Sequence, residues 1–231
     1  MNKIYYTNDD STCLPHENRD DWLPPNVLKA QLQDKLLIFC GAGISSNAGL
    51  PTFCKLVEEI AEEILFIKKR NPRKKTQYLY NNEVLQEFTE LMQKREYDRA
   101  ITYLEQYSQT RNINFKEKIN NYLAKRLFKK KNDVDLSPHK NIIQLATSED
   151  KVRLVTTNFD NLFELAAEQL TTGIDIKLYL APLIPPNAHR NNWSGIIKLH
   201  GSVDPEGNSD IVLSSGDFGR AYYNGPKKLD C

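Results

Sequence analysis

The chain has 231 residues, enough for one domain that buries a substantial core. Its 31 basic and 30 acidic residues give a net charge of +1, so bulk electrostatics indicate neither nucleic acid nor an anionic membrane as a partner. Its apolar runs are too short to span a bilayer, and residues 1–12 lack the apolar segment of a secretory signal. We therefore expect a cytoplasmic location.

The four cysteines are scattered along the chain and form no C-x-x-C pair: they are Cys13, Cys40, Cys54 and Cys231. This spacing argues against a zinc ribbon and against a disulfide scaffold, and it fits a reducing compartment. We expect no metal site and no structural zinc.

The first part of the chain predicts an N-terminal arm, a short helix and a buried strand. Residues 1–24 are polar and prolines stand at positions 15, 24 and 25, which is typical of a loosely held arm. Pro25 can open a short helix through Leu32. Residues 36–40 are uniformly apolar, which predicts a strand covered on both faces.

A glycine-rich segment follows this strand. Gly41 to Ser46 predicts a tight turn, and an amphipathic helix begins beyond Pro51 with apolar residues from Leu56 to Leu65. A strand, a glycine-rich turn and a helix together present backbone N–H groups to a phosphate. Taken alone, the glycine pair is better explained by a turn that binds no ligand, because Ser46 replaces a third glycine and the Walker A lysine is missing.

The middle of the chain predicts an all-helical insertion at about 68–135. Residues 68–75 carry six basic side chains, which we interpret as a solvated loop because no aromatic residues interleave them. From residue 83 to 131 the apolar residues repeat at helical spacing. The three expected stripes are Val84, Phe88 and Leu91; Tyr97, Ile101 and Leu104; and Phe115, Ile119, Leu123 and Leu127.

Strands and helices then alternate to the end of the chain. Ser137 is the expected N-cap of a helix that has Pro138 at its first position. Strands are expected at 152–156, 176–180, 195–199 and 210–214, with helices at 162–170 and 217–223. This order predicts an α/β fold with a doubly wound, mostly parallel, Rossmann-like sheet.

Three polar clusters fall at the carboxyl ends of predicted strands, where such sheets bind ligands. They are residues 41–45, 158–160 and 200–202. Separately, Asn158 and Asp160 are explained as helix caps and His200 as an ordinary hydrogen-bonded histidine. Together the clusters suit a nucleotide site, with backbone N–H groups for phosphates, an amide for a polar ligand group and an imidazole as base.

The motifs at these three places resemble the ordered motif set of the sirtuins. They read GAGIS followed by GLPTF at 41–53, TTNFD at 156–160 and KLHGS at 198–202. In that family the first loop binds NAD, the second follows a strand, and the H-G segment carries the catalytic base. The resemblance implies an NAD-binding domain at 25–231.

Departures from the deacylating sirtuins narrow this resemblance. The zinc module with its two C-x-x-C pairs is missing, Cys54 stands where those enzymes carry arginine, and Thr157 replaces a glutamine. The chain is more similar to the bacterial sirtuin-like NAD hydrolases of anti-phage defence, with Val212, Leu213 and Asp217 matching a further segment. Because those domains continue into another strand, we expect this one to lack its C-terminal strand and to form a homo-oligomer or bind a defence-system partner.

The resemblance implies an NAD+ glycohydrolase in which Asn158 orients ribose or water and His200 is the base. NAD is the expected substrate; a membrane is not an expected partner, and nucleic acid is not expected for this domain. The expected NAD-binding residues are Gly41, Ala42, Gly43, Ser45, Pro51, Phe53, Thr157, Asp160 and Gly201. The alternatives are an NAD-dependent protein deacylase and a catalytically inactive, nucleotide-binding regulatory domain.

Overall fold

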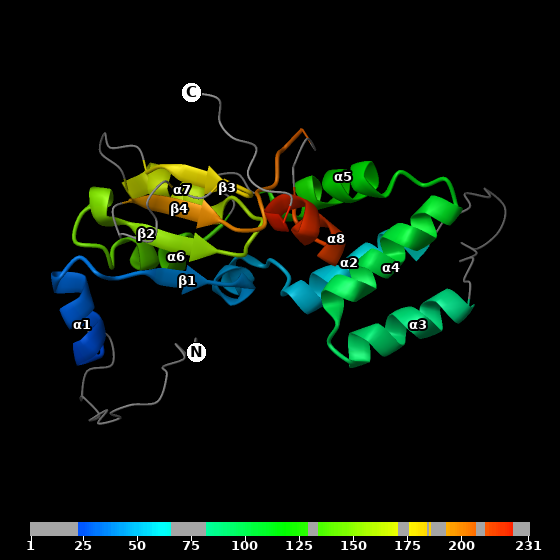
Figure 1. Ribbon diagram of the computed structural model, residues 1–231. Helices are drawn as coiled ribbons and strands as arrows, with labels where there is room; N and C mark the ends of the chain where they lie inside the picture. The colour runs from blue at the N-terminus through cyan, green and yellow to red at the C-terminus, as the bar shows by residue number, and fades with distance from the viewer. Residues whose placement is uncertain are drawn as a thin grey trace.

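The protein is built on a four-stranded parallel sheet (Figure 1). The computed structural model describes residues 23–65, 82–128, 134–170, 176–183, 185, 193–206 and 211–223. The strands are β1 (Ile38–Cys40), β2 (Arg153–Thr156), β3 (Leu178–Leu180) and β4 (Gly195–Lys198), in the order β1-β2-β4-β3. Each neighbouring pair is parallel. This confirms an α/β fold with a parallel sheet, which is compatible with a Rossmann-like arrangement.

The central strands are buried as the sequence predicts, whereas β1 is not. All four residues of β4 are buried, and Leu154 of β2 is completely enclosed. On β1, however, the Phe39 side chain is 64% exposed and Leu37, just before the strand, is 57% exposed. The prediction that this strand is covered on both faces is wrong, because the described elements leave the face that carries Phe39 open.

Two helices pack on each other beside the sheet: α6 (Ser137–Ile143) and α7 (Leu162–Leu170). Helix α7 has the predicted bounds. Helix α6 begins one residue earlier than predicted, because Leu136 is its N-cap and Ser137 is already helical. The Ser137 N–H is bound by the Asp135 carboxylate at 2.9 Å, so the side chain of Asp135 serves this end of the helix.

Of the α-helices described between β1 and β2 in the chain, four gather at the carboxyl-end side of the sheet (Figure 1). They are α2 (Phe53–Leu65), α3 (Asn82–Gln93), α4 (Tyr97–Thr110) and α5 (Phe115–Leu127). Helix α2 packs on α4 and α5, and α3 packs on α4. The predicted apolar stripes are buried or half-buried along these helices. The predicted basic loop at 68–75 lies outside the described residues.

The two ends of the described chain differ in how well the sequence predicted them. Helix α1 (Pro25–Leu32) has the predicted start and end, while residues 1–22 of the expected arm lie outside the described residues. The strand expected at 210–214 is wrong for residues 211–214, which are irregular and bind the sheet region through one bond from Val212 N to His200 O at 3.0 Å. The helix expected at 217–223 starts earlier, as α8 (Ser215–Phe218) followed by a π-helical turn, η4 (Gly219–Tyr223).

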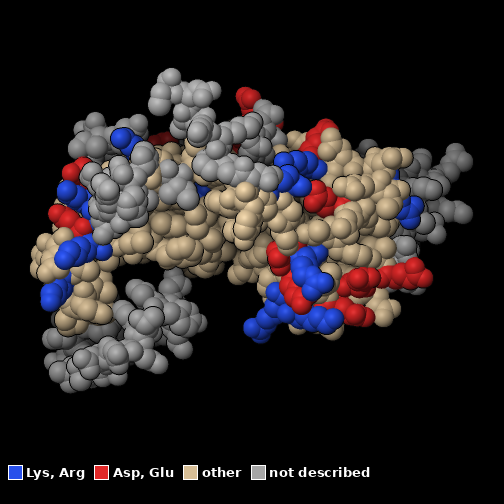
Figure 2. All heavy atoms as spheres, viewed as in Figure 1, with Lys and Arg blue, Asp and Glu red and all other residues tan. Residues whose placement is uncertain are grey.

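The described surface carries charges of both signs. On the face shown in Figure 2, lysines and arginines lie beside aspartates and glutamates over the helical layer. Within the described ranges, no helix is both long and apolar enough to cross a membrane.

Candidate active site

The three predicted polar segments meet at one edge of the sheet. The register sets Cys40 opposite Thr156 and Thr156 opposite Lys198, so the loops after β1, β2 and β4 leave the sheet at the same level. Two more backbone bonds extend the ladder beyond the strands, from Thr157 N to Cys40 O at 3.2 Å and from Leu199 N to Thr156 O at 2.9 Å. The prediction that these segments share the carboxyl edge is confirmed.

The glycine-rich segment is more regular than the tight turn expected from the sequence. Residues Ala42–Ala48 form a 3-10 helix, η1, which ends at Gly49 with a φ of 72°. This left-handed conformation favours glycine, which explains the residue type at the start of the GLPTF motif. The Arg126 guanidinium of α5 donates to Gly49 O at 3.3 Å and pairs with Glu59 at 2.9 Å, so the helical layer holds the end of this loop.

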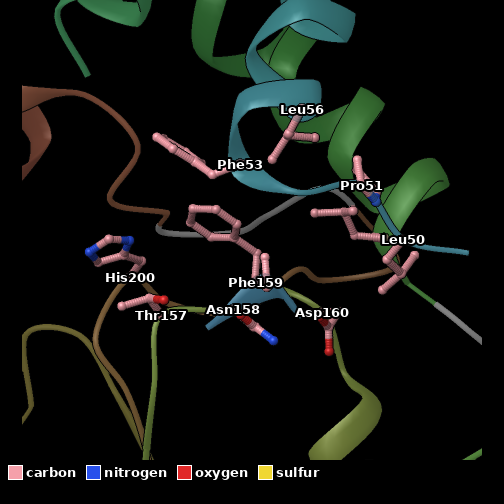
Figure 3. A pocket seen from close by; sticks show the side chains of 11 residues that line it. Leu50, Pro51, Phe53, Leu56, Thr157, Asn158, Phe159, Asp160 and His200 are labelled. Carbon is pink, nitrogen blue, oxygen red and sulfur yellow. The ribbon is translucent and has the colours of Figure 1, made fainter. Parts of the chain in front are cut away.

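A cavity of about 210 Å³ lies where the three segments meet the helical layer (Figure 3). Its lining includes these residues predicted for the site: Ala42, Pro51, Phe53, Thr157, Asn158, Asp160 and His200. The remaining lining residues are apolar and had not been predicted for the site: Leu50, Leu56, Leu127 and Phe159. Four predicted residues do not line it: Gly41, Gly43, Ser45 and Gly201.

Ser45 lies beneath the cavity as the centre of a buried hydrogen-bond network. Its side chain is almost fully enclosed, and its hydroxyl donates to Asp160 Oδ2 at 2.9 Å. It accepts from Asn158 Nδ2 at 3.1 Å, and the His139 Nε2 lies 3.2 Å away. Because the single hydroxyl hydrogen goes to Asp160, the His139 contact requires Nε2 to be the donor. Both lone pairs of Ser45 are therefore occupied.

This network fixes the orientation of the Asn158 amide. The amide nitrogen is engaged by Ser45, and the backbone N–H of Asn158 donates to Thr156 Oγ1 at 3.1 Å. The amide oxygen, Oδ1, is buried and has no hydrogen-bond partner within the described part of the chain. A buried acceptor of this kind is normally satisfied, so Oδ1 is the atom of Asn158 best suited to bind a donor on a ligand.

Asp160 shapes the turn that carries Asn158. Its Oδ1 accepts from Leu162 N at 3.1 Å, which links the turn to the start of α7. Burial raises the pKa of the Asp160 carboxyl, and the nearby charge of Lys198 opposes that rise. The Lys198 ammonium is only 1% exposed and donates to Asp160 O, to Glu164 Oε1 at 2.6 Å and to Ser202 Oγ at 2.7 Å. Lys198 thus ties the turn after β2 to the turn after β4.

His200 lies at the edge of the cavity, beside Thr157 and Phe159 (Figure 3). Its ring centroid is 5.8 Å from that of Phe159. Burial lowers the pKa of His200, so its imidazole is neutral near pH 7 and able to accept a proton. The turn continues through Gly201, whose φ of 80° again favours glycine.

The cysteines of the described chain do not form a reactive or metal-binding cluster. Cys40 and Cys54 are both free thiols, and burial raises the pKa of Cys40 to about 11, so it remains protonated. In the ranges the structure describes, no three histidine, cysteine, aspartate or glutamate side chains come together as metal ligands.

The sequence did not predict two buried residues that support the site without lining the cavity, His139 and Lys198. Lys198 belongs to the KLHGS segment, but its contacts depend on tertiary structure. His139 stands in a short helix whose other buried residue is Ile143, four positions later. A histidine on the apolar face of a helix was the available signal, although it does not identify the partner.

Two comparisons with known proteins agree with this geometry. Residues 152–230, which include Asn158 and His200, match the SIR2-like domain family. The chain is also 27% identical over 192 residues to the NAD(+) hydrolase ThsA of Bacillus cereus (strain MSX-D12). That alignment covers 82% of this chain and 32% of the relative, so the chain spans about a third of the length of the curated protein it matches. Both matches agree with the resemblance to sirtuin-like NAD hydrolases that the sequence motifs indicate.

Proposed function

We propose that this chain is an NAD+ glycohydrolase that cleaves the bond between nicotinamide and ribose. The observation that carries the proposal is the convergence of Asn158 and His200 on one cavity whose other wall is the loop from Ala42 to Phe53. The family matches supply the substrate class, since the relative is named as an NAD(+) hydrolase.

In the proposed reaction, the bond between C1′ of the ribose and the nicotinamide nitrogen breaks, and its electron pair leaves with nicotinamide. A water oxygen then bonds to C1′, and one proton of that water is released. Positive charge develops on the ribose as the bond breaks, as in glycoside hydrolysis. The products are nicotinamide and ADP-ribose.

Each polar residue then has a defined task. The Asn158 Oδ1, which is free of other partners in the described chain, accepts a hydrogen bond from a ribose hydroxyl or from the attacking water and holds it in line. The neutral His200 accepts the proton from water or from a ribose hydroxyl. Asp160 keeps its role in the turn and in orienting Ser45.

The cavity suits one end of a dinucleotide. Its volume of about 210 Å³ is below the ~300–1,000 Å³ usual for drug-sized ligands, so it accommodates a fragment of NAD. Apolar walls from Phe53, Leu56 and Leu127 fit the planar pyridine ring. We assign the nicotinamide-ribose end to this cavity and the pyrophosphate to the backbone of the exposed residues Gly41 and Gly43.

The wider biological role is part of the same proposal. We propose that residues 25–231 form one sirtuin-like domain with a helical insertion at about 68–135. We further propose that it works in the cytoplasm in anti-phage defence, depleting NAD as a homo-oligomer or with a defence-system partner.

The direct test is to mix the purified chain with NAD+ and to quantify free nicotinamide and ADP-ribose by chromatography. A parallel reaction with an acetyl-lysine peptide distinguishes hydrolysis from deacylation. Nicotinamide release that does not depend on the peptide supports the hydrolase. Release that requires the peptide and yields deacetylated product contradicts it.

A further inference from the structure

We propose that His139 is a positioning residue for the proposed NAD cleavage, acting on Asn158 through Ser45. The inference rests on the proposed function and names a residue that neither the motifs nor the family matches point to. His139 lies outside the matched residues 152–230 and 19 positions before Asn158 in the sequence.

The position of His139 is fixed by packing. Its side chain is fully buried in α6, and its ring meets that of Phe163 edge-on, with centroids 4.7 Å apart. This contact joins α6 to α7 and aims Nε2 at Ser45, 3.2 Å away. The imidazole therefore has little freedom to move away from the hydroxyl.

With Asp160 as an ionised acceptor, hydrogen-bond counting gives a direction to each contact. A hydroxyl has one hydrogen and two lone pairs, and the hydrogen of Ser45 goes to Asp160. The lone pairs are filled by the N–H groups of His139 and Asn158. Burial lowers the pKa of His139 to about 4, so at neutral pH the ring carries a single hydrogen, which this geometry assigns to Nε2. The other nitrogen, Nδ1, is a buried acceptor that has no partner in the described chain.

The consequence concerns the orientation of the Asn158 amide. With His139 on one lone pair, the Ser45 hydroxyl offers a single remaining acceptor site, which Asn158 Nδ2 fills. Without His139, the Ser45 hydroxyl still donates to Asp160 but offers two acceptor sites instead of one to Asn158 Nδ2, so Oδ1 is no longer held in one place. Loss of such orientation affects the transition state more than the binding of substrate.

The first test compares three variants in the full chain. His139→Leu removes the donor at similar volume, His139→Gln restores an N–H donor near the Nε2 position, and Ile143→Val is the control, one turn further along the same buried face of α6. We expect kcat for nicotinamide release to fall ~10–100-fold in His139→Leu with little change in KM, and to recover largely in His139→Gln. Ile143→Val should match the wild type. Equal kcat in wild type and His139→Leu, or a Gln variant as slow as the Leu variant, overturns the proposal.

The second test asks whether His139 acts through Ser45. Adding His139→Leu to Ser45→Ala should cause no further loss of kcat, because the shared partner is already gone. Independent losses that multiply in the double variant would show that His139 acts by another route.

The third test does not depend on activity. In ¹⁵N-labelled protein, His139 should be the Nε2–H tautomer, and its Nε2 resonance should shift in Ser45→Ala. An Nδ1–H tautomer, or no shift, refutes the contact even if the variants of His139 fail to fold. By contrast, a wild type that shows the expected tautomer and shift but releases no nicotinamide refutes the proposed function itself.

Discussion

Removing the buried Lys198 ammonium should destabilise the protein strongly. Lys198→Met keeps most of the volume but deletes three hydrogen bonds, to Asp160 O, Glu164 Oε1 and Ser202 Oγ. It also leaves the Glu164 carboxylate, 21% exposed and with Oε2 already unpartnered in the described chain, without its counter-charge. Breaking a buried ion pair in this way costs about 3–5 kcal/mol, and partial access of water to Glu164 favours the lower end. A loss of about 3 kcal/mol is a large share of the ~5–15 kcal/mol that stabilises a typical domain.

The assay is urea unfolding of wild type, Lys198→Met, Glu164→Gln and the double variant. The double variant should lose less unfolding free energy than the sum of the two single losses, because Glu164→Gln removes the carboxylate charge that Lys198→Met leaves unpaired. Lys55→Met is the control, since Lys55 pairs with Glu58 on the surface, where the two side chains are 55% and 46% exposed. If Lys198→Met shifts the unfolding midpoint no more than Lys55→Met does, the reasoning about the buried pair is refuted.

Three further predictions concern the loop and the base. Gly43→Val should abolish NAD binding in calorimetry, because the branched side chain would occupy the place proposed for the pyrophosphate. The far-UV spectrum should not change, because no atom lies within 4 Å of the position of an added Cβ. Wild-type affinity would contradict the phosphate assignment. Gly49→Ala should lower the unfolding free energy by about 1–2 kcal/mol through its φ of 72°, and an unchanged melting temperature would contradict this. Activity should fall on the acid side of the pH profile as His200 gains a proton. Because burial lowers the pKa of His200, the midpoint of this fall should lie below the ordinary pKa of 6.5. A midpoint above 6.5 would exclude His200 as the buried base.

Local patterns predicted the parts of the fold in which neighbouring residues decide the structure. The helical stripe through Ile119, Leu123 and Leu127 is buried, and the strands that end before Thr157 and Leu199 are present. The meeting of the polar loops followed from the rule that parallel strands end at one edge of a sheet. The α/β class and the position of the cavity could therefore be predicted from sequence alone.

The remaining features depend on tertiary contacts that leave little trace in sequence. The apolar residues at 211–213 suggested a strand, but a strand needs a hydrogen-bonded neighbour. Among the described residues, this segment shares one backbone bond with the His200 loop. Phe39 was expected to be covered because its neighbours are apolar, whereas its exposure depends on which elements pack on that face of the sheet. Ser45 and His139 lie 94 positions apart in the chain, so the sequence around either residue does not indicate their contact.

The most direct test of the central claim is nicotinamide release by wild type, Asn158→Ala and His200→Ala, measured together with their melting temperatures. If Asn158 orients the reacting group and His200 is the base, both variants should remain folded and bind NAD nearly as well as wild type. Their kcat should fall by roughly 10²–10⁴-fold, the usual scale for general acid–base groups. Normal turnover per folded molecule in either variant, with only a lowered melting temperature, would make that residue structural and contradict the proposed active site.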